Sequence, residues 1–245
     1  MKIALIQMSS AKGKVAQNLE QTLFFIQTAR QNGAEIIVFP EMNLTGYFTK
    51  EKYSDKCLSL DSAEVKKVIE MSNGMTIVFG IAEEKDGKKY ISQVVAQDGK
   101  ILGVYRKNNI KDNETLLFSP GLEEPVFTVG ENKFGITICA DIDQPELFSA
   151  YAKKGCNMIF ECASPDLYGD RENRNWEKGY LWWKKNCIEK IGKYAKENKI
   201  NIAVATGSGR NEEDDFPGGG YFFSPNGDIF KETTDYKQEI LYCDI

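Results

Sequence analysis

The sequence predicts an α/β fold in which parallel and antiparallel strands are mixed. Two observations carry this prediction. Short apolar runs alternate with segments whose apolar residues recur at helical spacing, and several later runs are joined by short turns rich in Gly, Asn and Asp. The alternation is typical of parallel strands joined by helices, and the turns are typical of antiparallel hairpins. Because no Pro-rich or Gly/Ser-rich linker divides the 245 residues, we expect one domain over residues 1–245.

Two strand–helix units come first. Each begins with a short apolar run and continues into a segment whose apolar residues lie three or four apart, as on the buried face of a helix. Asn32-Gly33 ends the first helical pattern, and Asp61-Ser62-Ala63-Glu64 resembles a capping box at the start of the second. The predicted elements are a strand over 3–8, a helix over 15–29, a strand over 34–39 and a helix over 65–69.

Strands and hairpins dominate the rest of the chain. Gln97-Asp98-Gly99-Lys100, Gly130-Glu131-Asn132 and Pro225-Asn226-Gly227-Asp228 are turn sequences between strand-like runs. A stripe of aromatic and apolar residues marks one long helix. The predicted strands cover 75–82, 90–96, 101–105, 126–129, 134–138, 157–161, 201–205 and 239–243, and the predicted helices cover 145–154 and 173–199.

Histidine is absent, and this is the most restrictive feature of the composition. Histidine is the usual general base near neutral pH and a common metal ligand, so Ser-His-Asp triads, Cys-His dyads and zinc sites with histidine ligands are excluded. The six cysteines are spread along the chain with no CxxC pair, which disfavours a disulfide framework or an all-cysteine zinc site. We therefore expect neither a metal nor a cofactor.

The rest of the composition is that of an ordinary globular protein, with 42% hydrophobic residues, 27% charged residues and a formal net charge of −5. An acidic chain without a long basic run is a poor match for nucleic acid or an anionic membrane. The first apolar run is interrupted at Gln7, and no segment approaches the roughly 18 apolar residues of a membrane span. We expect a cytoplasmic protein with reduced thiols and with no nucleic-acid or membrane partner.

Three reactive side chains each come one or two residues after a predicted strand: Glu41, Lys107 and Cys139. Ligands of open α/β sheets bind beyond the carboxyl ends of the strands, so a carboxylate, an ammonium group and a thiol could converge there. Taken singly, each residue also has an ordinary structural interpretation. Glu41 and Lys107 could be solvated charges at strand ends, and Cys139 could be a small buried residue of the core.

The sequence around these residues resembles the signature segments of the nitrilase superfamily of carbon–nitrogen hydrolases, in the family's order. The matching segments are Phe39-Pro40-Glu41-Met42-Asn43-Leu44-Thr45-Gly46-Tyr47, Tyr105-Arg106-Lys107, Glu114-Thr115-Leu116-Leu117-Phe118-Ser119-Pro120-Gly121, Ile138-Cys139-Ala140-Asp141 with Pro145-Glu146, and Phe216-Pro217-Gly218 with Ser224-Pro225-Asn226-Gly227. The resemblance implies a nitrilase-like αββα sandwich with mixed sheets in four layers, built when two subunits pair. It also implies a homodimer or a higher homo-oligomer.

The resemblance further implies a hydrolase that cleaves a non-peptide C–N bond of a small linear amide or N-carbamoyl amine. Cys139 would be the nucleophile that forms a thioester, Glu41 the general base and Lys107 the stabiliser of the oxyanion. Glu114 would be a second carboxylate that orients the lysine or the water; its alternative is a glutamate on a helix surface. The chemistry is sound without histidine, because a carboxylate desolvated in a cleft can have its pKa raised until it accepts a thiol proton.

Four more residues are expected to border the substrate. Tyr47 follows the glutamate segment, the backbone N–H of Ala140 would join the oxyanion site, and Ser164 opens the loop 164–169 after another strand. Asp143 stands where some relatives that bind a substrate carboxylate have arginine. We expect this acid to repel carboxylate substrates and to favour a neutral or cationic amide.

Three other features have predominantly structural interpretations. Asn109 stands where members often carry histidine, and the catalytic core does not need it. Trp176 and Trp183 belong to the helical stripe, which favours packing in the core or at a subunit interface over ligand contact. Glu212-Glu213-Asp214-Asp215 is predicted to be a solvated mobile loop.

Two alternatives from other functional classes stay open. One is a catalytically weak binding or interaction module that keeps the nitrilase fold, and the intact Glu41, Lys107 and Cys139 argue against it. The other is a redox or storage protein that uses its cysteines, which the missing CxxC pair disfavours.

Overall fold

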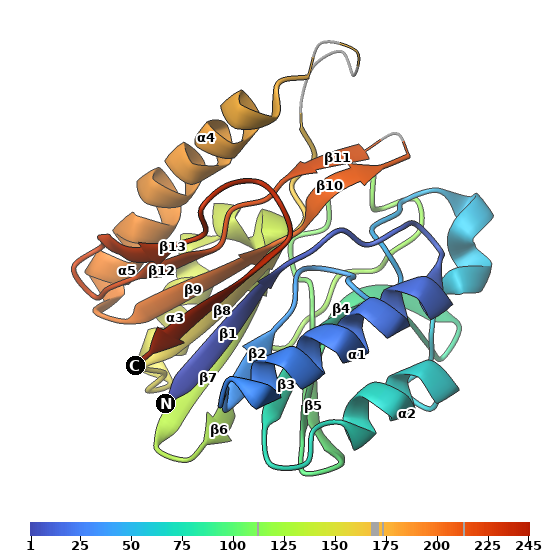
Figure 1. Ribbon diagram of the computed structural model, residues 1–245, viewed down its shortest axis with the longest axis horizontal. Coiled ribbons are helices and arrows are strands. Elements are labelled where there is room, and N and C mark those ends of the chain that lie inside the picture. Colours follow the sequence, from blue (N-terminus) through green and yellow to red (C-terminus); the bar gives the residue numbers. More distant parts are fainter. Residues whose placement is uncertain (112, 168–171, 173, 213) are drawn as a thin grey trace.

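Two six-stranded sheets form the centre of the computed structural model, which describes residues 1–111, 113–167, 172, 174–212 and 214–245 (Figure 1). Two helices cover the outer face of the first sheet, and three helices cover the outer face of the second. The predicted α/β sandwich with mixed sheets is confirmed. All four layers lie within one chain, however, so the expectation that pairing of two subunits builds them was wrong.

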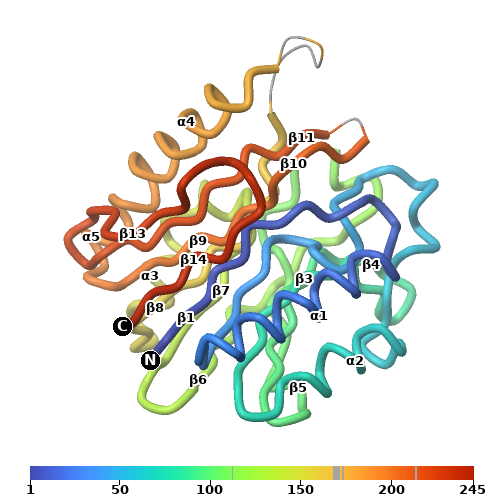
Figure 2. Tube along the Cα trace, viewed as in Figure 1, coloured from blue at the N-terminus to red at the C-terminus, as the bar shows by residue number. Residues whose placement is uncertain are grey.

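The first sheet has the strand order β14-β1-β2-β3-β4-β5. The pairs β1/β2 and β2/β3 are parallel, and the other pairs are antiparallel. The two chain ends lie side by side on β1 and β14 (Figure 2). The strands are β1 (Lys2–Gln7), β2 (Ile36–Val38), β3 (Thr76–Lys85), β4 (Lys88–Gln97), β5 (Lys100–Arg106) and β14 (Glu239–Asp244).

The side chains of β1 point alternately to the two faces of the first sheet, and each face borders a different hydrophobic core. Ala4 and Ile6 pack against helices α1 (Val15–Gln31) and α2 (Ala63–Glu70), whereas Ile3 and Leu5 belong to the core that includes the second sheet. The capping box predicted at 61–64 is not formed as such, because the N-cap of α2 is Ser62 and its side chain makes no capping hydrogen bond.

The second sheet has the order β13-β12-β9-β8-β7-β6, with β7, β8 and β9 parallel. Its strands are β6 (Phe127–Val129), β7 (Asn132–Ile138), β8 (Met158–Ala163), β9 (Asn201–Thr206), β12 (Tyr221–Phe223) and β13 (Ile229–Glu232). Its helices are α3 (Pro145–Lys153), α4 (Trp176–Cys187) and α5 (Lys193–Asn198). Two short 3₁₀ segments, η1 (Glu51–Lys56) and η2 (Cys139–Asp143), lie in loops.

The helix predicted over 173–199 is interrupted by one π-helical turn, η4 (Ile188–Gly192), between α4 and α5. Asn175 caps the start of α4 by accepting a hydrogen bond from the backbone N–H of Lys178 at 2.8 Å, and residue 173 lies outside the described residues. A π-turn inserts one extra residue into the helical repeat, which re-aims the side chains around it.

The acidic run at 212–215 was wrongly predicted to be a solvated mobile loop. Asp214 and Asp215 belong to β11 (Asp214–Pro217), which pairs with β10 (Ser208–Asn211), and Glu213 lies outside the described residues. Asp215 is fully buried and lies 3.2 Å from the guanidinium of Arg174. The burial of this charge is possible because Arg174, about 40 positions away in the sequence, compensates it. A local charge pattern does not reveal so distant a partner.

Among the residues that the structure describes, no helix is both long and apolar enough to cross a bilayer.

Candidate active site

The strands that carry Glu41, Lys107 and Cys139 all end at the same side of the molecule. Within the first sheet, β2 is parallel to β3, and two antiparallel steps then make β5 run the same way. The second sheet joins at this side through a parallel bridge between Met8, just after β1, and Gly207, just after β9. The convergence expected from the strand ends is therefore present.

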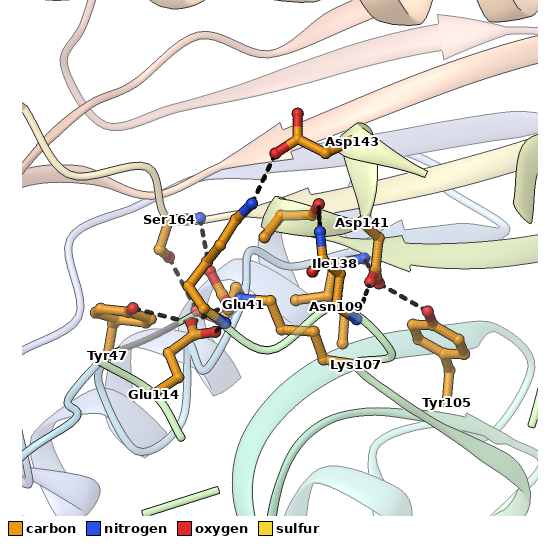
Figure 3. Close-up of polar contacts among 12 residues, drawn as sticks. Glu41, Tyr47, Tyr105, Lys107, Asn109, Glu114, Ile138, Asp141, Asp143 and Ser164 are labelled. Atoms are coloured by element: carbon orange, nitrogen blue, oxygen red, sulfur yellow. Dashed lines mark hydrogen bonds and ion pairs between the residues drawn. The ribbon is translucent and has the colours of Figure 1, made fainter. Parts of the chain in front are cut away.

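Lys107 lies between two buried carboxylates. Its Nζ is 2.9 Å from Oε1 of Glu41 and 2.7 Å from Oε1 of Glu114, and none of the three side chains is more than 1% exposed (Figure 3). Glu114 is thus a member of the buried cluster, and its alternative interpretation as a surface glutamate is excluded. Such a cluster is stable only because each carboxylate has a cation and further donors.

Two of the residues expected to border the substrate hold these carboxylates in place. The Tyr47 hydroxyl donates to Oε1 of Glu114 at 2.9 Å, and the backbone N–H of Ser164 donates to Oε2 of Glu41 at 3.0 Å (Figure 3). The Ser164 hydroxyl also donates to the Glu41 carbonyl at 3.1 Å. Tyr47 and Ser164 therefore fix the orientation of the acids in addition to lining the site.

Cys139 occupies a strained turn where β7 ends and η2 begins. Its φ of 46° lies in the left-handed region that non-glycine residues rarely adopt. The turn is stabilised by the buried carboxylate of Asp141, which accepts hydrogen bonds from the Ile138 backbone N–H at 2.9 Å and from the Tyr105 hydroxyl at 2.7 Å. Asp141 belongs to the signature segment, but the sequence did not reveal this bracing role.

Asn109 connects the lysine loop to the cysteine turn. Its backbone N–H donates to Oδ1 of Asp141 at 2.8 Å, and its side-chain amide donates to the Ala140 carbonyl at 2.6 Å. The residue that replaces the more common histidine therefore helps to fix the peptide between Ala140 and Asp141. The Ala140 N–H belongs to the preceding peptide, so Asn109 bears only indirectly on the predicted oxyanion site.

Burial sets the protonation of the site. It raises the pKa of Glu41 from 4.5 to about 7, while the positive charge of Lys107 opposes the rise and the negative charge of Glu114 adds to it. Burial and the Glu41 charge raise the pKa of the Cys139 thiol well above its usual value. Burial alone would lower the pKa of Lys107, but the negative groups around it raise the pKa instead. The resting site at neutral pH thus holds a neutral thiol, a charged lysine and a Glu41 close to its titration midpoint.

These groups open into a pocket of about 280 Å³, a size suited to a small molecule. All eight residues named from the sequence lie at this site, and seven of them line the pocket wall: Tyr47, Lys107, Glu114, Cys139, Ala140, Asp143 and Ser164. A larger hollow of about 450 Å³ near Arg106 contains no cysteine, and Arg106 there is paired with Glu83 at 2.6 Å.

The pocket also has a wall from the long helical segment, where the sequence pattern favoured packing over ligand contact. Trp182, Trp183, Asn186 and Lys190 project into it from α4 and η4. Trp183 is buried and donates to the Thr206 hydroxyl at 3.0 Å, so it both packs in the core and borders the site. Positions 182, 186 and 190 are four residues apart, and this spacing in the sequence could have indicated that they share one face of the helix.

Asp143 lies in the pocket as expected, but it does not act as an isolated acid. Its carboxylate lies 2.8 Å from Nζ of Lys111 and 2.6 Å from Nζ of Lys190. Partial burial alone would raise its pKa, but hydrogen bonds from the two lysines hold the pKa below its usual value. The expectation that this acid repels carboxylate substrates neglected two cations that lie 32 and 47 positions away in the sequence.

The family model described as carbon-nitrogen hydrolase matches residues 2–245. A glutamine-dependent NAD(+) synthetase of Acinetobacter baylyi is 24% identical over 249 residues, which are 99% of this chain and 44% of that protein. A 2-oxoglutaramate amidase of Bacillus subtilis is 27% identical over 237 residues, which are 94% of this chain and 85% of that protein. The chain therefore spans less than half of the first relative.

Solved structures share the fold. A mutant of the amidase from Nesterenkonia sp. AN1, with the acetamide moiety of fluoroacetamide added covalently at its active-site cysteine, superposes with a TM-score of 0.84. The two sequences are 21% identical, and the match covers 100% of this chain and 90% of that one.

Proposed function

The chain belongs to the carbon–nitrogen hydrolase family, and on that premise we propose that it hydrolyses a small linear amide or N-carbamoyl amine through a thioester on Cys139. One observation carries this proposal: a buried lysine lies between two carboxylates beside a thiol at the base of a small pocket. This arrangement supplies a base, an oxyanion stabiliser and a nucleophile without histidine.

In the proposed acylation step, Glu41 takes the proton from the Cys139 thiol as the sulfur attacks the amide carbon. The carbonyl π electrons move to oxygen, and the oxyanion is held by the Lys107 ammonium and the backbone N–H of Ala140. The C–N bond then breaks, Glu41 gives its proton to the leaving nitrogen, and ammonia or an amine departs. A Glu41 pKa of about 7 suits both directions of this proton transfer.

In the proposed deacylation step, water attacks the thioester while Glu41 accepts its proton. The C–S bond breaks, the carboxylic acid leaves, and the proton returns to the Cys139 sulfur. Glu114 supports this step by holding Lys107 at 2.7 Å. Tyr47 and the backbone N–H of Lys111, which donates to Oε2 of Glu114 at 2.9 Å, keep Glu114 fixed. We assign Glu114 as a positioning residue for the lysine.

An amide is preferred over a nitrile as the substrate. The Bacillus subtilis relative is an amidase, which supports the amide. The enzymatic proposal is also favoured over the alternative of a weak binding module, since burying three charged side chains costs stability that ligand binding alone does not require.

The test is release of ammonia from a panel of small amides, nitriles and ureido compounds. We expect turnover of at least one amide or ureido compound and a loss of about 10³-fold or more in Cys139→Ala. The matched control is Cys57→Ala, because Cys57 is the other partly exposed thiol and burial raises its pKa to about 12. Turnover that survives Cys139→Ala, or that disappears equally in Cys57→Ala, would contradict the proposal.

A further inference from the structure

A cationic cluster lies on the wall of the pocket that contains Cys139. It consists of Lys111, Asp143 and Lys190, which we call the lysine cluster, and all three residues line the pocket. The two ammonium groups contact different oxygens of the same carboxylate, Oδ2 at 2.8 Å for Lys111 and Oδ1 at 2.6 Å for Lys190. Asp143 thus holds the two cations on either side of itself.

The lysine cluster has a net charge of +1, because two ammonium groups face one carboxylate. Each ammonium has three N–H donors, and its contact with Asp143 uses one of them. The side chains are between 39% and 49% exposed, so donors remain available toward the pocket and its mouth. An anionic group that enters the pocket would meet hydrogen-bond donors from two sides.

Lys111 is attached to the catalytic residues, and Lys190 lies on the wall of the same pocket. The backbone N–H of Lys111 donates to Glu114, which itself contacts Lys107. Lys190 belongs to the π-turn η4, and π-turns occur preferentially at functional sites because they re-aim helix side chains. The turn places Lys190 on the same pocket wall as Trp182 and Asn186.

The other charges of the pocket have their own partners. Lys107 is held between Glu41 and Glu114, as described above. Asp166 lies 3.3 Å from Arg174, and Asp214 lies 2.5 Å from Lys12. Among these groups of ion-paired side chains, the lysine cluster is the one in which the positive charges outnumber the negative charges.

We propose that the lysine cluster binds a carboxylate at the far end of the acyl group, so that the preferred substrates are half-amides of dicarboxylic acids. This inference rests on the proposed function, since it names the substrate class of the same site. The reacting amide lies at Cys139 and the free carboxylate lies at Lys111 and Lys190. A half-amide releases ammonia and a dicarboxylate.

The test compares three amides of matched length: succinamate, which ends in a carboxylate, butyramide, which ends in a methyl group, and 3-aminopropanamide, which ends in an ammonium group. We expect kcat/KM for succinamate to exceed that for butyramide by about tenfold or more at low salt, with 3-aminopropanamide lowest. Lys190→Met should reduce the succinamate-to-butyramide ratio about tenfold. Lys185→Met, on the same helix but paired with Glu189 outside the pocket, should leave the ratio unchanged.

Binding to Cys139→Ala separates a failure of this inference from a failure of the proposed function. Calorimetry should give a dissociation constant for succinamate about tenfold below that for butyramide, and Lys190→Met in the same background should remove the difference. Equal binding of the two amides, or a preference that survives Lys190→Met, overturns the assignment of the lysine cluster. Selective binding of succinamate by a protein that hydrolyses no amide would support the lysine cluster and contradict only the proposed function.

Discussion

Glu41 is the residue whose protonation the proposed chemistry depends on most. It is buried, its carboxylate contacts Lys107, and the Ser164 backbone N–H fixes its second oxygen. Because the Cys139 thiol has a raised pKa, it stays protonated until a base accepts its proton during attack. The base must therefore be ionised in the free enzyme.

This requirement predicts the acid side of the pH profile. With a Glu41 pKa of about 7, kcat/KM should fall as the pH drops through 7, because protonated Glu41 no longer accepts the thiol proton. The measurement is kcat/KM for butyramide, whose own charge does not change in this range. The observed midpoint belongs to the coupled group of Glu41, Lys107 and Cys139. A midpoint near 4.5, the value of an ordinary glutamate, would contradict the account.

The variant Glu114→Gln tests the electrostatic coupling between Glu114 and Glu41. The negative charge of Glu114 contributes to raising the pKa of Glu41. Glu114→Gln should therefore move the acid midpoint to lower pH, even though it also lowers turnover by loosening Lys107. A midpoint that stays in place or rises would show that Glu114 does not act on Glu41 as described.

Asp141 is a residue whose removal should affect stability. Its carboxylate is buried and accepts hydrogen bonds from Tyr105, Ile138 and Asn109. In Asp141→Asn an amide N–H₂ must face at least one of these donors, so we expect a loss of about 2 kcal/mol in the free energy of unfolding in urea. Asp61→Asn, whose side chain is 94% exposed, is the matched control and should change stability little. If both substitutions lowered the free energy of unfolding equally, Asp141 would not stabilise the turn at Cys139.

At the scale of elements, local patterns predicted most strands and helices, and long-range pairing accounts for the errors. The hairpin β10/β11 was missed because its acidic sequence suggests solvent, whereas Arg174 makes the burial of Asp215 favourable. The π-turn was missed because the apolar pattern of so short a segment does not distinguish the i→i+4 hydrogen bonds of an α-helix from the i→i+5 hydrogen bonds of a π-turn. The role of Lys190 depends on that turn, and so it was missed too.

The glycine of the Glu114-to-Gly121 segment shows how an element positions a site residue. The Gly121 N–H donates to the Lys107 carbonyl at 2.8 Å, and a Cβ at this position would lie 2.2 Å from the Arg106 carbonyl oxygen. Gly121→Ala should therefore displace the end of β5. We expect both a lower melting temperature and a loss of kcat of about tenfold or more, since misplacement of a catalytic group by about 1 Å is costly.

Gly74→Ala is the control for Gly121→Ala. Gly74 has a φ of 71°, but a Cβ there meets no atom within 4 Å. It should cost about 1 kcal/mol of stability through backbone strain and leave kcat unchanged. If Gly121→Ala behaves in the same way, the close approach to β5 does not position Lys107.

At the scale of the whole molecule, the two sheets bring together residues that are far apart in sequence. Glu41 and Lys107 come from the first sheet, and Cys139 and Ser164 come from the second. The sequence could predict this convergence, because strand ends and family-like segments are local features. It could not predict the lysine cluster, which unites a loop, a 3₁₀ turn and a π-turn.

The homodimer or higher homo-oligomer implied by the family resemblance stays a prediction. Leu181 and Ile188 are about half exposed on α4 and η4, and burial of such apolar area favours association. Light scattering in solution should give a mass of about 55 kDa, twice 27.6 kDa, or a larger multiple. A mass of 27.6 kDa at micromolar concentration would contradict it.

The proposed reaction requires that Cys139 carries the acyl group during turnover. The most direct measurement is mass spectrometry of enzyme quenched with acid during hydrolysis of succinamate or butyramide, followed by peptide mapping. We predict a mass increase equal to the acyl group, located on the peptide with Cys139 and removed by hydroxylamine. Ammonia release under the same conditions without any acyl group on Cys139 would contradict the account.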